Sequence, residues 1–161
     1  METLSITRKS HSPEESFRLA ESLGLRIQTP CRIALYGDLG AGKTHFVQGL
    51  ASGLGVAEGS YVTSPSYALI HSYEARLPLH HADLYRLSHS DEVFDIGLYE
   101  LMASEAVTVV EWAERMEGME IFDLEIRIEI HGESERTIRA QASGLHFQDL
   151  LRSWQQVSHP E

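Results

Sequence analysis

The segment GDLGAGKT, residues 37–44, constrains the fold more than any other part of this chain. It follows the apolar stretch RIALY and precedes a run with helical spacing that stops near Gly55. Glycines allow a tight turn with N–H groups pointing inward, and the start of the next helix is a natural anion site. The order of strand, glycine-rich turn and helix therefore predicts a loop that binds phosphate groups.

The eight residues match the pattern G-x-x-x-x-G-K-[ST] in full. Lys43, one of only two lysines, would bring a cation to the outer phosphates, and the Thr44 hydroxyl can ligate Mg²⁺. The alternative is a plain glycine-rich turn before a helix. Residue frequencies put a chance match in a chain of this length at roughly one in a hundred, which favours the phosphate loop.

Two acidic residues end apolar stretches and are candidates for chemistry. Phosphoryl chemistry needs a carboxylate for the metal and a group that positions the attacking water or hydroxyl. Glu111 follows AVTVV, where a metal-binding acid beside the loop strand is expected; the alternative is a solvated strand-end acid. Asp83 lies in HHADLYR, and its alternative is an ion pair with Arg86. His81 shares a strand face with Asp83, but Mg²⁺ at Thr44 makes a separate zinc site unfavoured.

The rest of the chain alternates helix and strand patterns. Ser12 and Glu15 form a capping box that starts a helix, and Gly24 is expected to end it. Further helices are expected over 43–54, 91–102 with a break at Gly97, and 150–157. Strands are expected over 32–36, 67–73, 79–85, 106–110, 124–130 and 136–142, the last two as an antiparallel pair. These patterns indicate an α/β fold in a single domain, 1–161.

Composition excludes several classes of function. The formal net charge is −11 with no run of Lys or Arg, which disfavours non-specific binding to DNA or RNA and to anionic membranes. The chain has one cysteine, Cys31, which is expected to be buried and suits a reducing compartment. The N-terminus lacks the apolar run of a signal peptide, and no apolar stretch approaches about 20 residues. We therefore expect a cytoplasmic protein that does not enter a membrane.

Three functions remain open from these residues. Guanine recognition usually needs Asn-Lys-x-Asp, which is absent, so ATP is favoured over GTP. A small-molecule kinase would be expected to carry an arginine-rich lid, but the arginines are scattered. An ATP hydrolase is one of the open functions, and the family resemblance described below makes it the leading hypothesis. The alternatives are a small-molecule kinase and a nucleotide-dependent binding module without turnover.

Four segments in order resemble a known family: LYGDLGAGKTHFVQGL, VTSPSYALIHSY, LHHADLYRL and VVEWAER. Together they resemble the TsaE (YjeE) family of small bacterial ATPases, which act in tRNA threonylcarbamoyladenosine biosynthesis. The similarity covers roughly residues 10–130. It implies a P-loop-type three-layer sandwich, with a mostly parallel or mixed central sheet, helices on both sides and a C-terminal antiparallel strand pair.

The resemblance also implies partner proteins with roles different from that of this chain. TsaE proteins bind a complex of TsaD and TsaB, in which TsaD transfers the threonylcarbamoyl group to tRNA. ATP hydrolysis by TsaE is thought to reset that complex between turnovers. The chain would therefore use ATP with Mg²⁺, be a weak ATPase alone, and meet tRNA only indirectly, through its partners.

The matching positions imply roles for individual residues. Thr44 and Glu111 would hold Mg²⁺, and Asp83, the family's essential acid, would act with Lys43 in catalysis. Ser64, in the S-P-S loop, would lie near the outer phosphate. The residues that would wrap the phosphates or lie near the nucleotide are Asp38, Leu39, Gly40, Ala41, Gly42, Lys43, Trp112 and Arg115.

Overall fold

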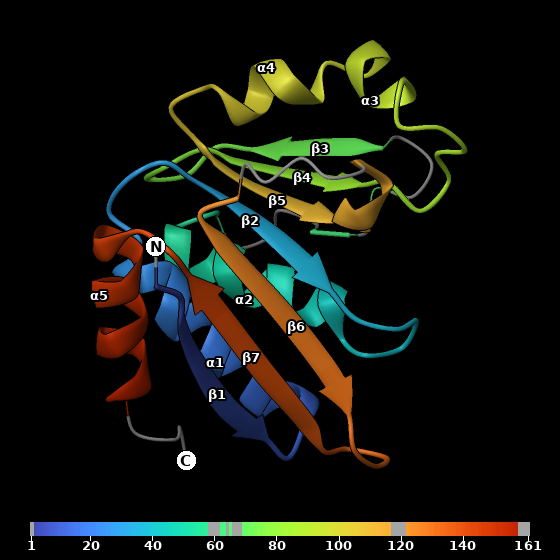
Figure 1. Cartoon of the computed structure of the whole chain (residues 1–161). Coiled ribbons are helices and arrows are strands. Elements are labelled where there is room, and N and C mark those ends of the chain that lie inside the picture. The colour runs from blue at the N-terminus through green and yellow to red at the C-terminus, as the bar shows by residue number, and fades with distance from the viewer. Residues whose placement is uncertain (1, 58–61, 64, 66–68, 117–121, 158–161) are drawn as a thin grey trace.

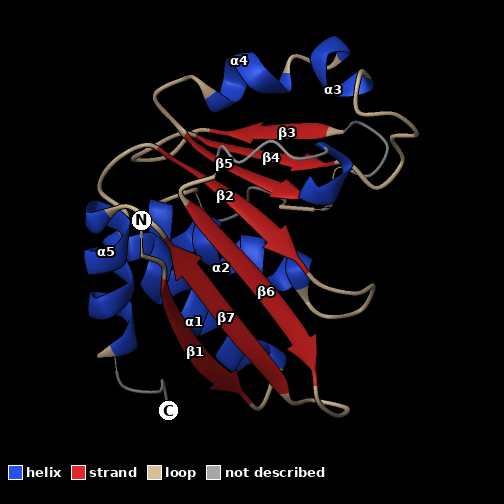
Figure 2. Ribbon diagram, viewed as in Figure 1, coloured by secondary structure: helices blue, strands red, loops and turns tan. Residues whose placement is uncertain are grey.

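The described part of the chain forms one seven-stranded sheet with helices on both faces (Figures 1 and 2). The computed structural model describes residues 2–57, 62–63, 65, 69–116 and 122–157. The strands are β1 (Leu4–Ser10), β2 (Cys31–Tyr36), β3 (Ile70–Tyr73), β4 (Leu79–Asp83), β5 (Val107–Glu111), β6 (Leu124–Ile130) and β7 (Arg136–Ala142). The helices are α1 (Pro13–Arg26), α2 (Lys43–Leu54), α3 (Glu92–Asp95), α4 (Leu98–Met102) and α5 (Leu145–Gln155), with a 3₁₀ turn, η1 (Ala113–Met116).

The sheet has a parallel centre and antiparallel edges. Its order is β1-β7-β6-β2-β5-β4-β3, and the neighbours from β6 to β4 run parallel. β3 is antiparallel to β4, and β7 is antiparallel to both β6 and β1. The predicted α/β class, mixed sheet and C-terminal strand pair are therefore confirmed. β2, which leads into the phosphate loop, lies at the middle of the sheet.

Two apolar clusters hold the three layers together. On one face of the sheet, α1, α2 and α5 cover the side chains of β2 and its neighbours, including Ile33 and Leu35. On the other face, α3 and α4 cover Ala34, Ala82 and Val110 (Figure 1). Consecutive residues of β2 thus enter different cores, as expected of a strand buried on both sides. None of the helices in the described part of the chain is long and apolar enough to cross a membrane.

The prediction that Gly24 ends the first helix is wrong, because α1 continues through it to Arg26. Gly24 is needed for packing instead. A Cβ atom there would lie 2.6 Å from the Leu50 carbonyl oxygen of α2, and Gly49 and Gly53 of α2 face the α1 backbone even more closely. The three glycines let the two helices cross with their backbones nearly in contact. The predicted start is confirmed, since the Ser12 hydroxyl accepts a hydrogen bond from the Glu15 N–H at 3.0 Å.

β1 is an element that the sequence patterns did not predict. Its buried positions carry Ile6, Arg8 and Ser10, so only one of the three is apolar. The guanidinium of Arg8 donates to the carbonyl of Trp154 at 2.6 Å, and the Ser10 hydroxyl bonds to that of Ser16. These partners lie on helices, so the strand is stabilised by long-range contacts that no local periodicity reveals.

Other boundaries differ by a few residues. β4 ends at Asp83 rather than 85, because the chain turns there and the Tyr85 N–H donates to the Asp83 carboxylate. β3 starts at Ile70, while 67 and 68 lie outside the described residues. The segment 91–102 forms two short helices with Gly97 between them, as predicted. α5 starts at Leu145 and ends before Val157.

Cys31 is buried as predicted, and burial raises the pKa of its thiol to about 12.

Candidate functional site

The phosphate loop joins the end of β2 to the start of α2. Gly40 and Gly42 have φ values of +82° and +101°, which side-chain-bearing residues rarely adopt. The Ala41 N–H donates to the Asp38 carbonyl at 3.0 Å and closes the turn. The first intrahelical bond of α2 runs from the Phe46 N–H to the Gly42 carbonyl, which leaves the preceding N–H groups at the helix start outside the helical pattern. The loop therefore has the backbone that an anion site requires.

Lys43 lies at the centre of this loop and is 7% exposed. Its Nζ donates to the Gly37 carbonyl at 2.7 Å and lies 4.3 Å from the centroid of the Trp112 ring. An ammonium above an aromatic face is attracted by the ring's negative quadrupole. Both contacts come from residues of the site itself, so the charge of Lys43 is held beside the loop.

The two candidate carboxylates lie together at the carboxyl ends of parallel strands. Asp83 is the register partner of Glu111, and Glu111 is the register partner of Leu35 in β2. The prediction that the strand of Glu111 lies next to the strand of the phosphate loop is confirmed. Asp83 and Glu111 are only 4% and 3% exposed. Ligands of open α/β sheets bind at this edge of the sheet.

A cavity of about 390 Å³ lies where the loop and the strand ends meet. Its lining comes from the loop and the start of α2 (Leu39, Gly40, Gly42, Lys43, Thr44, His45) and from the ends of β4 and β5 (Asp83, Tyr85, Glu111, Trp112). The other predicted residues Asp38, Ala41 and Arg115 do not line it, and Ser64 lies outside the described residues.

The oxygen donors in this cavity fit Mg²⁺. Thr44 contributes a hydroxyl, and Asp83 and Glu111 contribute carboxylates. Mg²⁺ prefers oxygen ligands in octahedral geometry and is usually bound by one or two protein groups, with waters and substrate phosphates completing the shell. A hydroxyl and an acid beside a phosphate loop are a donor set of that kind.

His81 orients one of these carboxylates. Its Nε2 is hydrogen-bonded to Glu111 Oε2 at 2.5 Å, and its ring is fully buried. Sequence reasoning placed His81 beside Asp83 on β4 but did not predict a bond to the neighbouring strand. Because one Glu111 oxygen is engaged by His81, the carboxylate is held in a defined orientation at the cavity.

Trp112 has an unusual backbone conformation for a residue with a large side chain. Its φ is +59°, a conformation that costs on the order of 1–3 kcal/mol for a non-glycine residue and clusters at functional sites. The ring centroids of Trp112 and Tyr85 are 5.0 Å apart, and Arg115 donates to the Tyr85 carbonyl at 3.4 Å. Tyr85 and His45 line the cavity but were not predicted as site residues, although both lie within the segments that carry the family resemblance.

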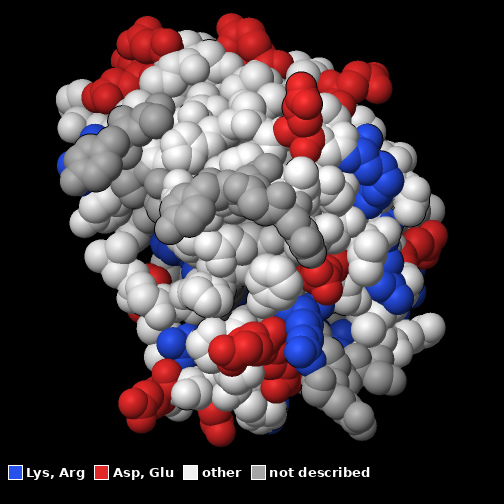
Figure 3. Space-filling model, turned by 180° about the vertical axis from the view of Figure 1, so that it is seen from behind, with Lys and Arg blue, Asp and Glu red and all other residues white. Residues whose placement is uncertain are grey.

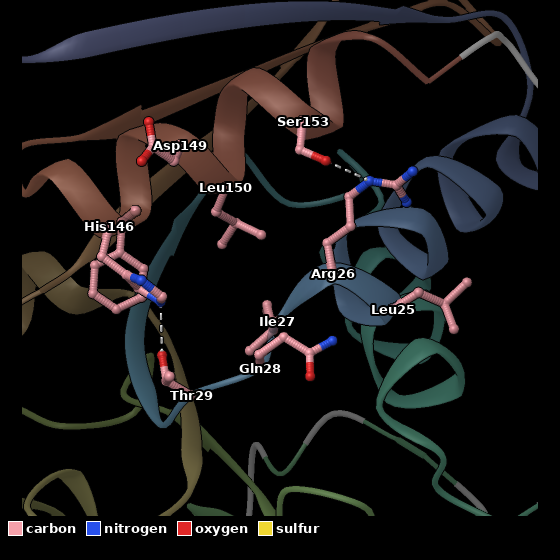
Figure 4. Close-up of a pocket in the computed structure, with 10 residues that line it drawn as sticks. Leu25, Arg26, Ile27, Gln28, Thr29, His146, Asp149, Leu150 and Ser153 are labelled. Carbon is pink, nitrogen blue, oxygen red and sulfur yellow. Dashed lines mark hydrogen bonds between the residues drawn. The ribbon is translucent and has the colours of Figure 1, made fainter.

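A second cavity of similar size, about 370 Å³, lies between the end of α1 and α5 (Figure 4). Its borders include a hydrogen bond of 3.0 Å between Thr29 and His146, and one of 3.2 Å from Arg26 to Ser153 (Figure 4). None of its lining residues belongs to the phosphate loop or to the strand ends. Volume therefore does not distinguish the two cavities, and chemistry selects the one at the loop.

The fold and this site define an α/β protein with a P-loop, in which buried acids at neighbouring strand ends face a glycine-rich turn and a helix start. The sequence profile of the family described as "Threonylcarbamoyl adenosine biosynthesis protein TsaE" matches residues 10–139. The chain belongs to the TsaE family.

Similar proteins agree with this assignment. The chain is 38% identical over 141 residues to the tRNA threonylcarbamoyladenosine biosynthesis protein TsaE of Bacillus subtilis, covering 86% of this chain and 87% of that one. It is 41% identical over 107 residues to the TsaE protein of Treponema pallidum, covering 66% and 78%. The crystal structure of YdiB from Bacillus subtilis superposes with a TM-score of 0.74 at 31% identity, covering 96% of each chain.

Proposed function

We propose that this chain binds ATP with Mg²⁺ and hydrolyses it to support the threonylcarbamoyladenosine modification of tRNA by the TsaD and TsaB proteins. One observation carries the proposal: a chain of the TsaE family has two buried carboxylates, Asp83 and Glu111, paired at the strand ends that face its phosphate loop. The relatives in Bacillus subtilis and Treponema pallidum are named for the same biosynthesis.

The groups of the site have separate roles in binding the nucleotide and its metal ion. The backbone N–H groups of the loop and of the α2 start bind the phosphates, and the Lys43 ammonium offsets the charge of the outer ones. To reach them, Lys43 leaves the Gly37 carbonyl and remains close to Trp112. Thr44 and Glu111 hold Mg²⁺, which when bound neutralises charge that develops on the phosphates. His81 keeps the Glu111 carboxylate in place.

Asp83 acts on the attacking water. Its Oδ1 accepts a hydrogen bond of 2.9 Å from the Tyr85 N–H, which fixes the carboxylate at the turn that follows β4. A carboxylate held in this way, at the edge of the cavity, orients a water molecule for attack on the outer phosphate. Trp112 and Tyr85, whose ring centroids are 5.0 Å apart, border the same cavity.

The charge of the chain suits a helper that docks on protein. The net charge is −11, and Figure 3 shows acidic side chains along both the upper and the lower edge of one face, with the basic ones in small groups. A surface of this sign is repelled by the phosphates of nucleic acid. We therefore place tRNA on TsaD and TsaB rather than on this chain. The role places the protein in the cytoplasm with its partners.

Reconstitution tests this proposal. We expect the purified chain to hydrolyse ATP slowly alone and faster when TsaD and TsaB are added, and we expect several rounds of tRNA modification only when this chain and ATP are both present. Modification that continues at the same rate over many turnovers without this chain would contradict the proposal.

The same assay separates the alternatives. A small-molecule kinase would transfer the outer phosphate to a metabolite rather than release it to water. A binding module without turnover would bind ATP and its partners, yet show no phosphate release in a single-turnover experiment. A pull-down with TsaD and TsaB, with and without ATP, establishes the partners independently of hydrolysis.

A further inference from the structure

Arg136 joins the C-terminal hairpin to the phosphate loop, although it lies 92 positions after Thr44, the last residue of the loop motif. Its Nε donates to the Ala41 carbonyl at 3.0 Å and its Nη2 to the Gly40 carbonyl at 3.3 Å. Its Nη1 donates to the carbonyls of Gly132 and Glu135, both at 2.9 Å. One guanidinium thus binds two carbonyls of the loop and two of the turn between β6 and β7.

The backbone of β7 at Arg136 is held by a neighbouring strand on each side. Arg136 is the first residue of β7, and its register partners are Ser10 in β1 and Ile130 in β6. The planar guanidinium presents its donors in a fixed fork, and its bonds to the carbonyls of Gly132 and Glu135 hold that fork against the turn between β6 and β7. The back of the loop is therefore tied to a strand inside the sheet.

The two bonds to the loop set the direction of two of its peptide groups. All peptide bonds of the described residues are trans, so the C=O of one residue and the N–H of the next point in opposite directions. Binding the Ala41 carbonyl directs the Gly42 N–H away from Arg136, and Gly42 lines the cavity. Binding the Gly40 carbonyl directs the Ala41 N–H, which closes the loop turn onto Asp38.

Arg136 also keeps its charge beside the loop. None of the ion pairs within the described ranges includes it, and all four acceptors are neutral carbonyls. Arg139, three residues further along β7, differs in this respect, because its Nη1 lies 3.4 Å from the Glu129 carboxylate and, among the described residues, it donates to no carbonyl of the loop. Arg136 does not line the cavity, so it acts from behind the loop.

We propose that Arg136 is a positioning residue for nucleotide binding, which holds the phosphate loop in its binding conformation through the carbonyls of Gly40 and Ala41. This inference rests on the proposed nucleotide site. Lysine at this position keeps the charge but loses the fork, so Arg136→Lys tests the geometry rather than the electrostatics. Arg139→Lys is the matched control, since it makes the same exchange on the same strand.

The experiment combines two measurements on the full chain. Calorimetry with MgADP is expected to give a Kd about tenfold higher for Arg136→Lys than for the wild type, and a Kd within about twofold for Arg139→Lys. Hydrogen exchange without nucleotide is expected to be faster at the amides of residues 40–43 in Arg136→Lys, with the amides of β2 unchanged as an internal reference for the fold. Should Arg136→Lys fail to fold, Arg136→Gln is used in the same two measurements.

These measurements distinguish failure of the positioning role of Arg136 from failure of the proposed nucleotide site. A Kd for the folded variant within twofold of the wild type overturns the positioning role, whether or not the loop exchanges faster. If the wild type itself does not bind MgADP, the proposed nucleotide site fails, and hydrogen exchange alone decides whether Arg136 holds the loop. Equal exchange of the loop amides in both proteins then overturns the inference.

Discussion

Replacing Asp83 with asparagine is expected to reduce ATP hydrolysis in the complex with TsaD and TsaB by about 100-fold or more, because the attacking water loses a carboxylate partner. Asparagine keeps the size of the side chain and still accepts the hydrogen bond from the Tyr85 N–H. MgATP affinity should therefore stay within about threefold of the wild type, since this is the pattern of an interaction made in the transition state. Phosphate release and calorimetry measure the two quantities separately.

The control for this variant is Asp95→Asn, which removes one negative charge from an exposed position on α3 that does not line the cavity. It should hydrolyse ATP like the wild type. Full hydrolysis by Asp83→Asn in the assembled complex would show that the carboxylate has no part in activating water. The residue would then be a structural acid at the end of β4.

The largest effect on stability is expected at the crossing of α1 and α2. In Gly53→Ala, the new Cβ would lie 2.7 Å from the Leu25 nitrogen and closer still to the Glu21 carbonyl. Both are backbone atoms of α1 that cannot turn aside, so the helices must separate. Overpacking of this severity is expected to lower the free energy of unfolding by about 3 kcal/mol, although alanine favours an isolated helix by about 1 kcal/mol relative to glycine.

Urea unfolding followed by circular dichroism measures this loss. Gly144→Ala is the matched control, because no atom lies within 4 Å of a Cβ at that position and its φ of −80° suits alanine. Its unfolding free energy should change by less than about 1 kcal/mol. If Gly53→Ala were as stable as the wild type, the close crossing of α1 and α2 would be wrong.

The sequence predicts the parts of the site that are formed by residues close together along the chain. The phosphate loop needs glycine at Gly40 and Gly42, where φ is positive, and a lysine and threonine directly after, so eight consecutive residues carry the signal. Glu111 was predicted because an acid after a buried parallel strand must lie at the sheet's carboxyl edge.

The parts that were missed depend on contacts between distant segments. Gly24 has the residue type of a helix end, and only the backbone of α2 shows why a glycine is needed in mid-helix. The polar inward face of β1 is satisfied by α1 and α5. The bond between His81 and Glu111 joins β4 to β5. The bond from Arg136 to the Ala41 carbonyl joins β7 to the phosphate loop. Local patterns carry no information on such pairs.

Nucleotide binding by the isolated chain tests the central claim most directly. Calorimetric titration of MgADP into the wild type and into Lys43→Ala compares the loop with and without its ammonium, which lies 4.3 Å from the centroid of the Trp112 ring. We expect one site in the wild type and binding at least about 30-fold weaker in the variant, in keeping with the loss of a charge-assisted contact to the phosphates. Equal affinity of the two proteins would contradict the account.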